Sequence, residues 1–582
     1  MRFEEYFQRE VLALRGLARE AMQRNPALEP FFGTPGRDAD VERLIESFAF
    51  LMARLQQKLD DDLPEITQPL FSQLWPNYLR PLPAASIIQY EPGSNTTNTS
   101  AIPRGTLVES MPVDGTRCQF RTIYDVDLLP LKVTEQRMIE RNGMTVIAVR
   151  FALIGGNLQT LQLSDLRVFF TGEHTIPHTL YLTLTHRLKE LRCVIKDNKG
   201  RENITAVLPP SCVTPLGFHK DEGMLPYSDS TALGYRILQE YFCYPEKFLF
   251  VRIADLQQGL SQEIRQRFSN AGEFELHFVL DHRPEGYESF HAKNWNLYCT
   301  PVINIFPVAT QQQQMTHGTF GHKIVPDAHF PNHYTVYNIE QAETWTKRQG
   351  RQIASQSDYI PFFKNAPRYR LHIVPTPDGE CMETYIQMDG ADEPNLFVTL
   401  QLLCTNRDLP ARLGLGDICM VAGSAEAAAA PFKNILPVSH PSPPPYSNDI
   451  LWKLLSNMSL NTVALTDVSA FRAMIATYAF RTVWNFTQAK LLDKHLQSIR
   501  AIKSPSTDMI FNGLPRRGGQ TTIIVDQSCF PCEGAMYLFG SVLNEFLSMY
   551  ATVNSFHQLI INEASSGEEY HWPARLGSIL RR

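Results

Sequence analysis

The chain has 582 residues, a net charge of −6 at pH 7 and a sequence pI near 6.3. Hydrophobic residues make up 43% of the chain and charged residues 20%, which excludes a disordered or collagen-like protein. The slightly acidic balance argues against nucleic acid as the main partner, because no overall positive charge attracts phosphate backbones.

Two amphipathic helices are predicted in the first expected domain, residues 1–83. The first helix covers residues 3–23, with an apolar seam at spacings of three and four that consists of Phe3, Phe7, Val11, Leu14, Leu17 and Ala21. The second covers residues 41–59, and its near-heptad seam consists of Val41, Leu44, Ile45, Phe48, Leu51, Met52, Leu55 and Leu59. Because no β-rich core has yet begun, two interpretations stay open: the seams pack within the chain, or they join an intermolecular helical bundle.

The middle of the chain is predicted to be β-rich. Short β-branched and aromatic runs alternate with turn residues, which indicates one β-rich domain with a single helix at 84–255 and a second β-rich domain at 256–421. One of the expected strands is residues 179–184. For His174 and His178, Pro177 and this strand-like context argue against a helical pair of metal ligands.

The last third of the chain has two predicted parts. Residues 422–448 are rich in Ala and Pro and are expected to form a linker or covering arm. Residues 449–582 are expected to form a C-terminal α+β domain, with a long helix at 534–552 followed by a strand at 554–561. We expect the seam of that long helix to pack within the chain.

Residues 217–253 are dense in aromatic and turn residues yet contain no recognisable catalytic grouping. A one-faced helix is predicted here, ended by Pro245 and followed by a short apolar strand. Its aromatic side chains fit either of two roles, partner docking or packing in the core, and the candidates are Tyr235, Tyr241, Tyr244 and Phe248.

No motif for catalysis, nucleotide binding or metal binding is present. The sequence lacks a P-loop, an HExxH pair and a GxSxG elbow. The pair Cys529 and Cys532 has the spacing of half a zinc site, but no second CxxC or HxxxH follows. We therefore expect no catalytic residue, no metal and no cofactor. A β-rich hydrolase or carbohydrate-active enzyme, with carboxylates brought together only by folding, remains the competing hypothesis.

Localisation is predicted from two missing signals. The N-terminus lacks a basic segment followed by an apolar run, and no apolar run approaches the length that spans a bilayer. The ten cysteines lie mostly among apolar neighbours, which favours reduced, buried thiols. A cytoplasmic protein is expected. A secreted effector or adhesin is a third hypothesis, and the missing signal weighs only against export by the general pathway.

Six sequence segments, in order along nearly the whole chain, carry a family resemblance. They are YFQRE at 6–10, VERLIESFAFLMARLQQKLDDDLPE at 41–65, LWPNYLRPLP at 74–83, the block from LPYSDS to GYRILQEYFCYPEKFLF at 225–250, CTNRDLP at 404–410 and FLSMYATVNSF at 546–556. With these segments the chain resembles the TssF family, also called ImpG or VasA, a baseplate subunit of the bacterial type VI secretion system.

The resemblance implies a structural role in an elongated α+β protein of a baseplate wedge. Implied partners are TssG, a second TssF copy, TssK, TssE and the VgrG spike, with indirect docking on the inner-membrane complex and support of sheath polymerisation and contraction. It also implies that the N-terminal helices form a bundle with TssG, and the expected contact residues are Phe3, Tyr6, Phe7, Leu14, Leu44, Phe48, Leu51 and Leu55. Tyr235, Tyr241, Tyr244 and Phe248 are the next candidates.

Overall fold

The structure is a computed structural model of the chain, and it separates into two compact units. One unit comprises Met1–Leu79 and Tyr446–Ser459, and the other comprises Arg80–Pro445 and Leu460–Arg582. The described residues are 7–17 without 9 and 16, 39–60, 76–93, 100–227 with short gaps, 233–315 without 269–270, 321–346, 350–356, 368–376, 382–389, 396–422, 430–443, 467–477, and 486–577 without 512 and 552–553.

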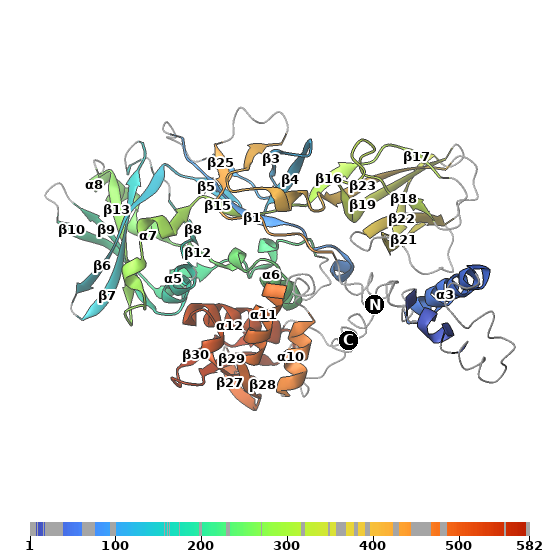
Figure 1. Ribbon diagram of the computed structural model, residues 1–582. Coiled ribbons are helices and arrows are strands. Elements are labelled where there is room, and N and C mark those ends of the chain that lie inside the picture. The colour runs from blue at the N-terminus through green and yellow to red at the C-terminus, as the bar shows by residue number, and fades with distance from the viewer. Residues whose placement is uncertain are drawn as a thin grey trace. The chain divides into compact units, whose positions relative to one another are not determined.

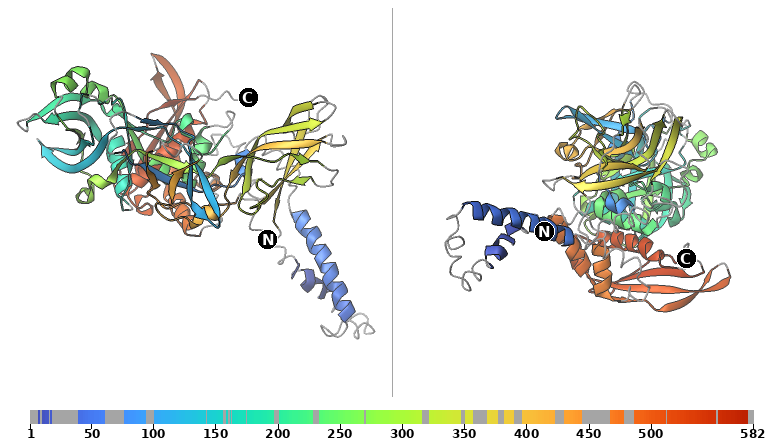
Figure 2. Two further views of the ribbon diagram at one scale, coloured as in Figure 1. Left: turned by 90° about the horizontal axis from the view of Figure 1, so that it is seen from above. Right: turned by 90° about the vertical axis from the view of Figure 1, so that its right-hand side faces the viewer.

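The first unit contains the predicted N-terminal helices. Helix α3 (Ala39–Asp60) is the long helix seen in Figure 2, and it confirms the helix expected at 41–59. Residues 7–8, 10–15 and 17 are also helical, within the helix expected at 3–23. The short 3-10 helix η2 (Pro76–Leu79) ends this part of the chain.

A six-stranded antiparallel sheet lies at the centre of the second unit (Figure 1). Its order is β24 (Ile418–Val421), β3 (Leu107–Val113), β4 (Thr116–Thr122), β15 (Cys299–Ile303), β1 (Ala85–Tyr90) and β25 (Phe432–Asn434). Strands from both expected β-rich domains therefore share one sheet. The expected linker contributes β25, which pairs with β1, and Ser442, which bridges to Leu82.

Two further antiparallel sheets are built from residues 131–297. The five-stranded sheet has the order β10 (Glu202–Leu208), β9 (Leu188–Lys196), β13 (Glu273–Leu280), β7 (Met144–Leu153) and β6 (Leu131–Arg141). The four-stranded sheet has the order β11 (Val213–Pro215), β12 (Phe250–Ile253), β8 (Leu166–Phe170) and β14 (Trp295–Leu297). A separate antiparallel pair joins β2 (Ser100–Ile102) to β5 (Val126–Leu128).

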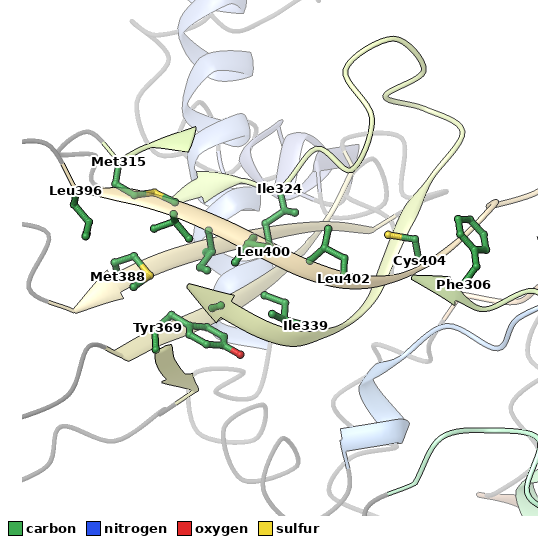
Figure 3. Packing of buried hydrophobic residues seen from close by; sticks show 14 residues of the cluster. Phe306, Met315, Ile324, Ile339, Tyr369, Met388, Leu396, Leu400, Leu402 and Cys404 are labelled. Atoms are coloured by element: carbon green, nitrogen blue, oxygen red, sulfur yellow. The ribbon is translucent and has the colours of Figure 1, made fainter. Parts of the chain in front are cut away.

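An eight-stranded sheet encloses its own apolar core. Its order is β16 (Phe306–Ala309), β23 (Phe397–Thr405), β19 (Thr335–Thr346), β20 (Gly350–Gln356), β21 (Arg368–Pro375), β22 (Met382–Asp389) and β18 (His322–Lys323), with β17 (Gln313–Gln314) paired to β23. Side chains from alternate positions, such as Val398, Leu400 and Leu402 of β23, point to one face and are buried there. Figure 3 shows this cluster, with Ile339, Tyr369 and Met388 packed against Leu400 and Leu402.

The C-terminal part combines a sheet with helices. The strands are β26 (Ile499–Lys503), β28 (Leu514–Val525), β29 (Phe556–Glu563) and β30 (Glu569–His571), with β27 (Ser506–Phe511) paired to β28 and β31 (Arg575–Leu576) paired to β29. The helices are α10 (Val468–Ala476), α11 (Phe486–Gln497) and α12 (Glu533–Ser548), beside the long strands in Figure 2. Because β28 and β29 pair in parallel with α12 between them, this is a β-α-β crossover.

Helix α12 packs within the chain, as expected from its seam. It lies between β29 and the pair α5 (Ile176–Thr185) and α6 (Leu233–Cys243), and its residues Gly534–Leu547 are buried (Figure 1). At Gly534 an added Cβ would lie 2.1 Å from the carbonyl oxygen of His178, so only glycine permits this approach of α12 to α5.

One predicted strand is wrong. Residues 179–184 lie in helix α5, which begins at Ile176 and contains both Pro177 and His178. Proline is compatible with the first helical turn, where its missing N–H has no intrahelical acceptor. The alternation Leu180, Leu182, Leu184 imitates a strand, yet the residues between them are buried as well, because the helix is covered on nearly every side. His174 lies outside the described residues.

Short helices complete the described fold. The α-helical segments are α7 (Leu256–Gly259) and α8 (Gln262–Arg267), and the 3-10 segments are η3 (Pro210–Cys212), η4 (Lys220–Glu222), η5 (Pro245–Phe248), η6 (Tyr287–Ser289), η7 (Ala292–Asn294), η8 (Leu409–Arg412) and η12 (Gln527–Cys529). In the part of the chain that the structure describes, no helix has the length and apolar character needed to cross a bilayer. The arrangement of several antiparallel sheets with helices confirms the α+β prediction.

Candidate protein-binding surface

The candidate surface is an exposed apolar stripe on α3, formed by Leu44, Phe48 and Leu51. Their exposed fractions are 69%, 54% and 64%. Because the spacings are four and three residues, the three side chains lie along one face of the helix. We refer to these three residues as the α3 stripe. Exposed large apolar side chains grouped on one helix face are typical of a surface that binds a partner.

A different face of α3 is covered by the chain itself. Ala49 and Ala53 are fully buried, and Ile45 and Met52 are half-buried. At 100° per residue this covered face lies about a third of a turn from the α3 stripe. The small alanine side chains let another segment approach the helix backbone closely. The broad seam predicted from the sequence is thus divided into a covered part and an exposed part.

The first helix contributes further apolar side chains to this unit. Phe7 and Leu14 are half-buried, and the ring of Phe7 meets that of Phe50 edge-on at 6.5 Å between centroids. Leu12 and Leu17 are exposed. Phe3 and Tyr6 lie outside the described residues, and Leu55 lies on α3 with a side chain that is not among those described.

The exposed residues Leu12 and Phe50 did not belong to the predicted seams. Their signal in the sequence was their size and apolar character alone, since their positions do not continue the seam spacing of either helix. Apolar side chains therefore surround more of these helices than a single seam requires, which fits helices that contact more than one neighbour.

The aromatic candidates of residues 217–253 are packed inside the chain. Tyr241, Tyr244 and Phe248 are buried, and Tyr235 is half-buried. The ring of Tyr241 lies 5.9 Å from that of Phe539 on α12 and 6.2 Å from that of Phe248, and Tyr235 lies 5.8 Å from Phe546. Intrachain packing accounts for these side chains, which is the second of the two roles that their sequence fits.

A charged network on the five-stranded sheet contains the candidate metal ligands Glu202, Glu275 and His277. Among the described residues these three bring ligand atoms within 4.8 Å of one another. Glu275, however, accepts hydrogen bonds from His277 at 2.9 Å, Lys196 at 2.9 Å and Arg150 at 3.0 Å. Burial raises the pKa of Glu275, but these hydrogen bonds outweigh burial and hold the pKa well below its usual range. The arrangement is therefore a salt-bridge network, because cationic side chains occupy the acceptor oxygens.

The other chemistry-bearing residues are also engaged in structure. Cys529 and Cys532 are half-buried free thiols, and neither belongs to the group of candidate metal ligands found among the described residues. Glu545 on α12 is buried, and burial raises its pKa although Arg575 forms an ion pair with it. These contacts hold elements together and assign no chemical step to these groups.

The comparisons with known proteins agree with one another over nearly the full chain. A family model described as "Type VI secretion system, TssF" matches residues 1–579. The type VI secretion system component TssF1 of Pseudomonas aeruginosa is 27% identical over 639 aligned residues, which cover 99% of this chain and 99% of that protein.

Two solved structures have a similar fold. A chain in the cryo-electron microscopy structure of a type VI secretion system TssK-TssF-TssG baseplate subcomplex matches with a TM-score of 0.76 and 26% identity, over 93% of this chain and 99% of that chain. A chain in a baseplate complex from the type VI secretion system matches with a TM-score of 0.68 and 24% identity over 100% of both chains. Since the family model covers nearly the whole sequence, the chain belongs to the TssF family of the type VI secretion system.

Proposed function

We propose that this chain is a structural subunit of the type VI secretion system baseplate and that it assembles with TssG and TssK. Family membership supports the role, and the similar structure that contains TssK, TssF and TssG supports the choice of partners. In this role the chain performs no bond-making step. It contributes rigid sheets and apolar contact surfaces instead.

The α3 stripe is the proposed contact with TssG, and its exposure is the observation that carries the proposal. Leu44, Phe48 and Leu51 would fill the spaces between side chains of a partner helix, as seam residues do in a helical bundle. Phe3, Tyr6, Phe7, Leu14 and Leu55 are proposed to extend this contact along the two helices. The buried aromatic residues Tyr241, Tyr244 and Phe248 are left out of the proposed contact.

The remaining partners are proposed from family membership. A second TssF copy would share one wedge with this chain, and TssE and the VgrG spike would be its neighbours in the complete baseplate. The baseplate would dock on the cytoplasmic face of the inner-membrane complex and support sheath polymerisation and contraction. This chain would be cytoplasmic and would reach the membrane only through its partners.

The test is the double variant Phe48→Asp with Leu51→Asp. Both side chains would become charged in a desolvated helical bundle, which costs several kcal/mol. We expect the affinity for TssG to fall at least about 100-fold, since about 2.8 kcal/mol corresponds to that factor. A pull-down of co-expressed TssG measures binding, and a thermal melt of the same variant measures the fold.

The matched control is Arg43→Asp, an exposed position of the same helix that is not three or four residues from any member of the α3 stripe. This single substitution changes the net charge by as much as the double variant, but outside the α3 stripe. We expect Arg43→Asp to retain TssG. If the double variant retained TssG, the α3 stripe would not be part of the interface. If the double variant melted early and broadly, the stripe would be part of the core of this chain.

A further inference from the structure

A pocket of about 530 Å³ lies in the unit that contains Arg80–Pro445. Two parts of the chain about 100 residues apart form its walls: the β3–β4 pair, with the turn before β3 and the end of β4, and the segment from Lys220 to Tyr227 together with the start of α6. Its lining includes Arg104, Arg121, Ile123, Leu225, Tyr227 and Leu233. Its volume is within the range of pockets that hold small organic molecules.

Arg121, at the end of β4, has the least balanced charge in this pocket. Within the described part of the chain its guanidinium makes no hydrogen bond and no ion pair within 4.0 Å. Burial lowers the pKa of Arg121, the longer-range negative charge of Glu340 opposes this, and the positive charge of Arg104 lowers the pKa further. A desolvated guanidinium close to a second one is unfavourable unless an anion binds near both.

The opposite wall is held in place by two other arginines. Arg104 donates to the backbone oxygen of Asp221 at 2.6 Å, and Arg236 donates to the backbone oxygens of Lys220 and His219, each at 2.7 Å. At Gly223 an added Cβ would lie 2.7 Å from Nη1 of Arg236, so this loop packs directly on the guanidinium. The pocket wall is therefore built by specific contacts and does not depend on the anion for its shape.

The charges on the wall are only partly neutralised. The carboxylate of Asp221 lies 3.8 Å from Arg104, and that of Glu240, behind the wall, lies 3.8 Å from Arg236. No carboxylate of the described residues forms such a pair with Arg121. Apolar side chains, Ile123, Leu225 and Leu233, line the same pocket beside the ring of Tyr227. The pocket thus combines an apolar wall with a guanidinium that has no carboxylate within 4.0 Å among the described residues.

We propose that this pocket binds a small organic molecule that carries a phosphate group, with the phosphate between Arg104 and Arg121 and the organic part against Ile123, Leu225 and Leu233. A phosphate monoester carries nearly two negative charges at pH 7 and three acceptor oxygens, so one group can receive hydrogen bonds from two guanidiniums. Arginine is the side chain best suited to such planar, two-pronged contacts.

Phenyl phosphate is the probe, because its ring can contact the apolar wall while its phosphate meets the arginines. Isothermal titration of the full chain, purified with co-expressed TssG, is expected to show saturable binding of phenyl phosphate, weaker binding of inorganic phosphate and none of phenol. Phenyl phosphate at about ten times its Kd should raise the apparent melting temperature by about 1–3 °C. Equal binding of phenol would overturn the anion site, and no binding of either phosphate at 10 mM would overturn the proposal.

The decisive variant is Arg121→Gln, and its matched control is Arg117→Gln on the same strand. Arg117 pairs with Glu109 at 3.3 Å and does not line the pocket. We expect Arg121→Gln to weaken phenyl phosphate binding at least tenfold and, without ligand, to melt no lower than the parent chain, because it removes a half-buried charge that has no carboxylate within 4.0 Å among the described residues. Arg104→Gln should also weaken binding. The proposed site would be wrong if Arg117→Gln weakened phenyl phosphate binding as much as Arg121→Gln does. It would also be wrong if Arg121→Gln and Arg104→Gln both left this binding unchanged.

Discussion

Glu240 joins three segments of the chain through one buried carboxylate. Its Oε1 accepts hydrogen bonds from the backbone N–H groups of Met224 at 2.7 Å and Leu225 at 3.0 Å, and its Oε2 accepts from the ammonium of Lys247. The side chains of Glu240 and Lys247 are fully buried. Burial lowers the pKa of Lys247, and the negative charge of Glu240 opposes that effect. This carboxylate ties the loop before α6 to the turn after it.

Replacing Glu240 by Gln should therefore destabilise the fold. The substitution keeps the shape but leaves Lys247 buried without its counter-charge, and breaking a buried ion pair in this way costs about 3–5 kcal/mol. Chemical denaturation of the variant measures the loss. Glu263→Gln is the control, since Glu263 is exposed on α8 and its replacement should change stability by less than about 0.5 kcal/mol. Equal stability of the two variants would show that the pair contributes nothing.

At the scale of elements, a half-buried histidine on α11 and a buried histidine on β29 belong to the C-terminal sheet and its helices. The ring of His495 on α11 stacks on Phe530 at 4.5 Å between centroids, and Nε2 of His557 on β29 lies 3.0 Å from Oγ1 of Thr521 on β28. Burial, with a smaller contribution from the charge of His178, lowers the pKa of His495 to about 4. Burial alone lowers the pKa of His557 to about 4.

These pKa values predict that acid destabilises the C-terminal elements. An unfolded histidine has a pKa near 6.5, so between about pH 6.5 and pH 4 the unfolded state binds more protons and stability falls as the pH falls. The loss by pH 4 is on the order of 2–3 kcal/mol for each histidine. Thermal melts at pH 7 and pH 5 should show the lower melting temperature at pH 5.

The variant His495→Phe separates this effect from other acid-sensitive contacts. Phenylalanine keeps a ring against Phe530 but cannot titrate, so the difference in melting temperature between pH 7 and pH 5 should shrink. His282→Phe replaces an exposed histidine and should leave the difference unchanged. An unaltered difference in His495→Phe would assign the acid sensitivity to other groups.

At the scale of the whole molecule, the second unit is held together by pairings between distant parts of the chain. Strand β1 near residue 85 pairs with β15 near residue 300 and with β25 near residue 433. This unit buries the aromatic residues Tyr241, Tyr244 and Phe248, whereas the first unit leaves the α3 stripe exposed together with Leu12 and Leu17. Exposed apolar side chains also occur in the second unit, among them Ile353 and Ile510, but the α3 stripe places three of them along one face of one helix.

We therefore expect the isolated chain to self-associate or to be poorly soluble, and co-expression with TssG to correct this. Size-exclusion chromatography with light scattering measures the mass with and without TssG. Phe48→Asp with Leu51→Asp should reduce self-association of the isolated chain, because it removes two residues of the α3 stripe. A monomeric parent chain at high concentration, unchanged by TssG, would argue against an exposed docking surface.

The periodicity of apolar residues was enough to predict several elements. The helix expected at 41–59 is α3, the helix of residues 534–552 is α12 over Glu533–Ser548, and the strand expected at 554–561 is β29. Local spacing determines such elements because each buries one recurring face. The same reasoning failed at α5, where a helix buried on nearly all sides carries no distinct polar face and its alternate leucines resemble a strand.

Tertiary structure alone decided which apolar residues are covered. Leu44 and Ile45 belong to the same predicted seam, yet Leu44 is exposed and Ile45 is half-buried. The reason is that other residues of the same chain cover only the side of α3 that holds Ala49 and Ala53. Likewise, the sequence around Tyr241 and Phe248 fits both docking and packing. The structure places α12, some 290 residues further along the chain, beside Tyr241, so this side chain packs within the chain. The pocket joins Arg104 and Arg121, at one end of the β3–β4 pair, to Leu225 and Leu233 about 100 residues further along, and no local pattern connects these two parts. Spacing along the chain determines the face of an element, but only long-range contacts determine what covers that face.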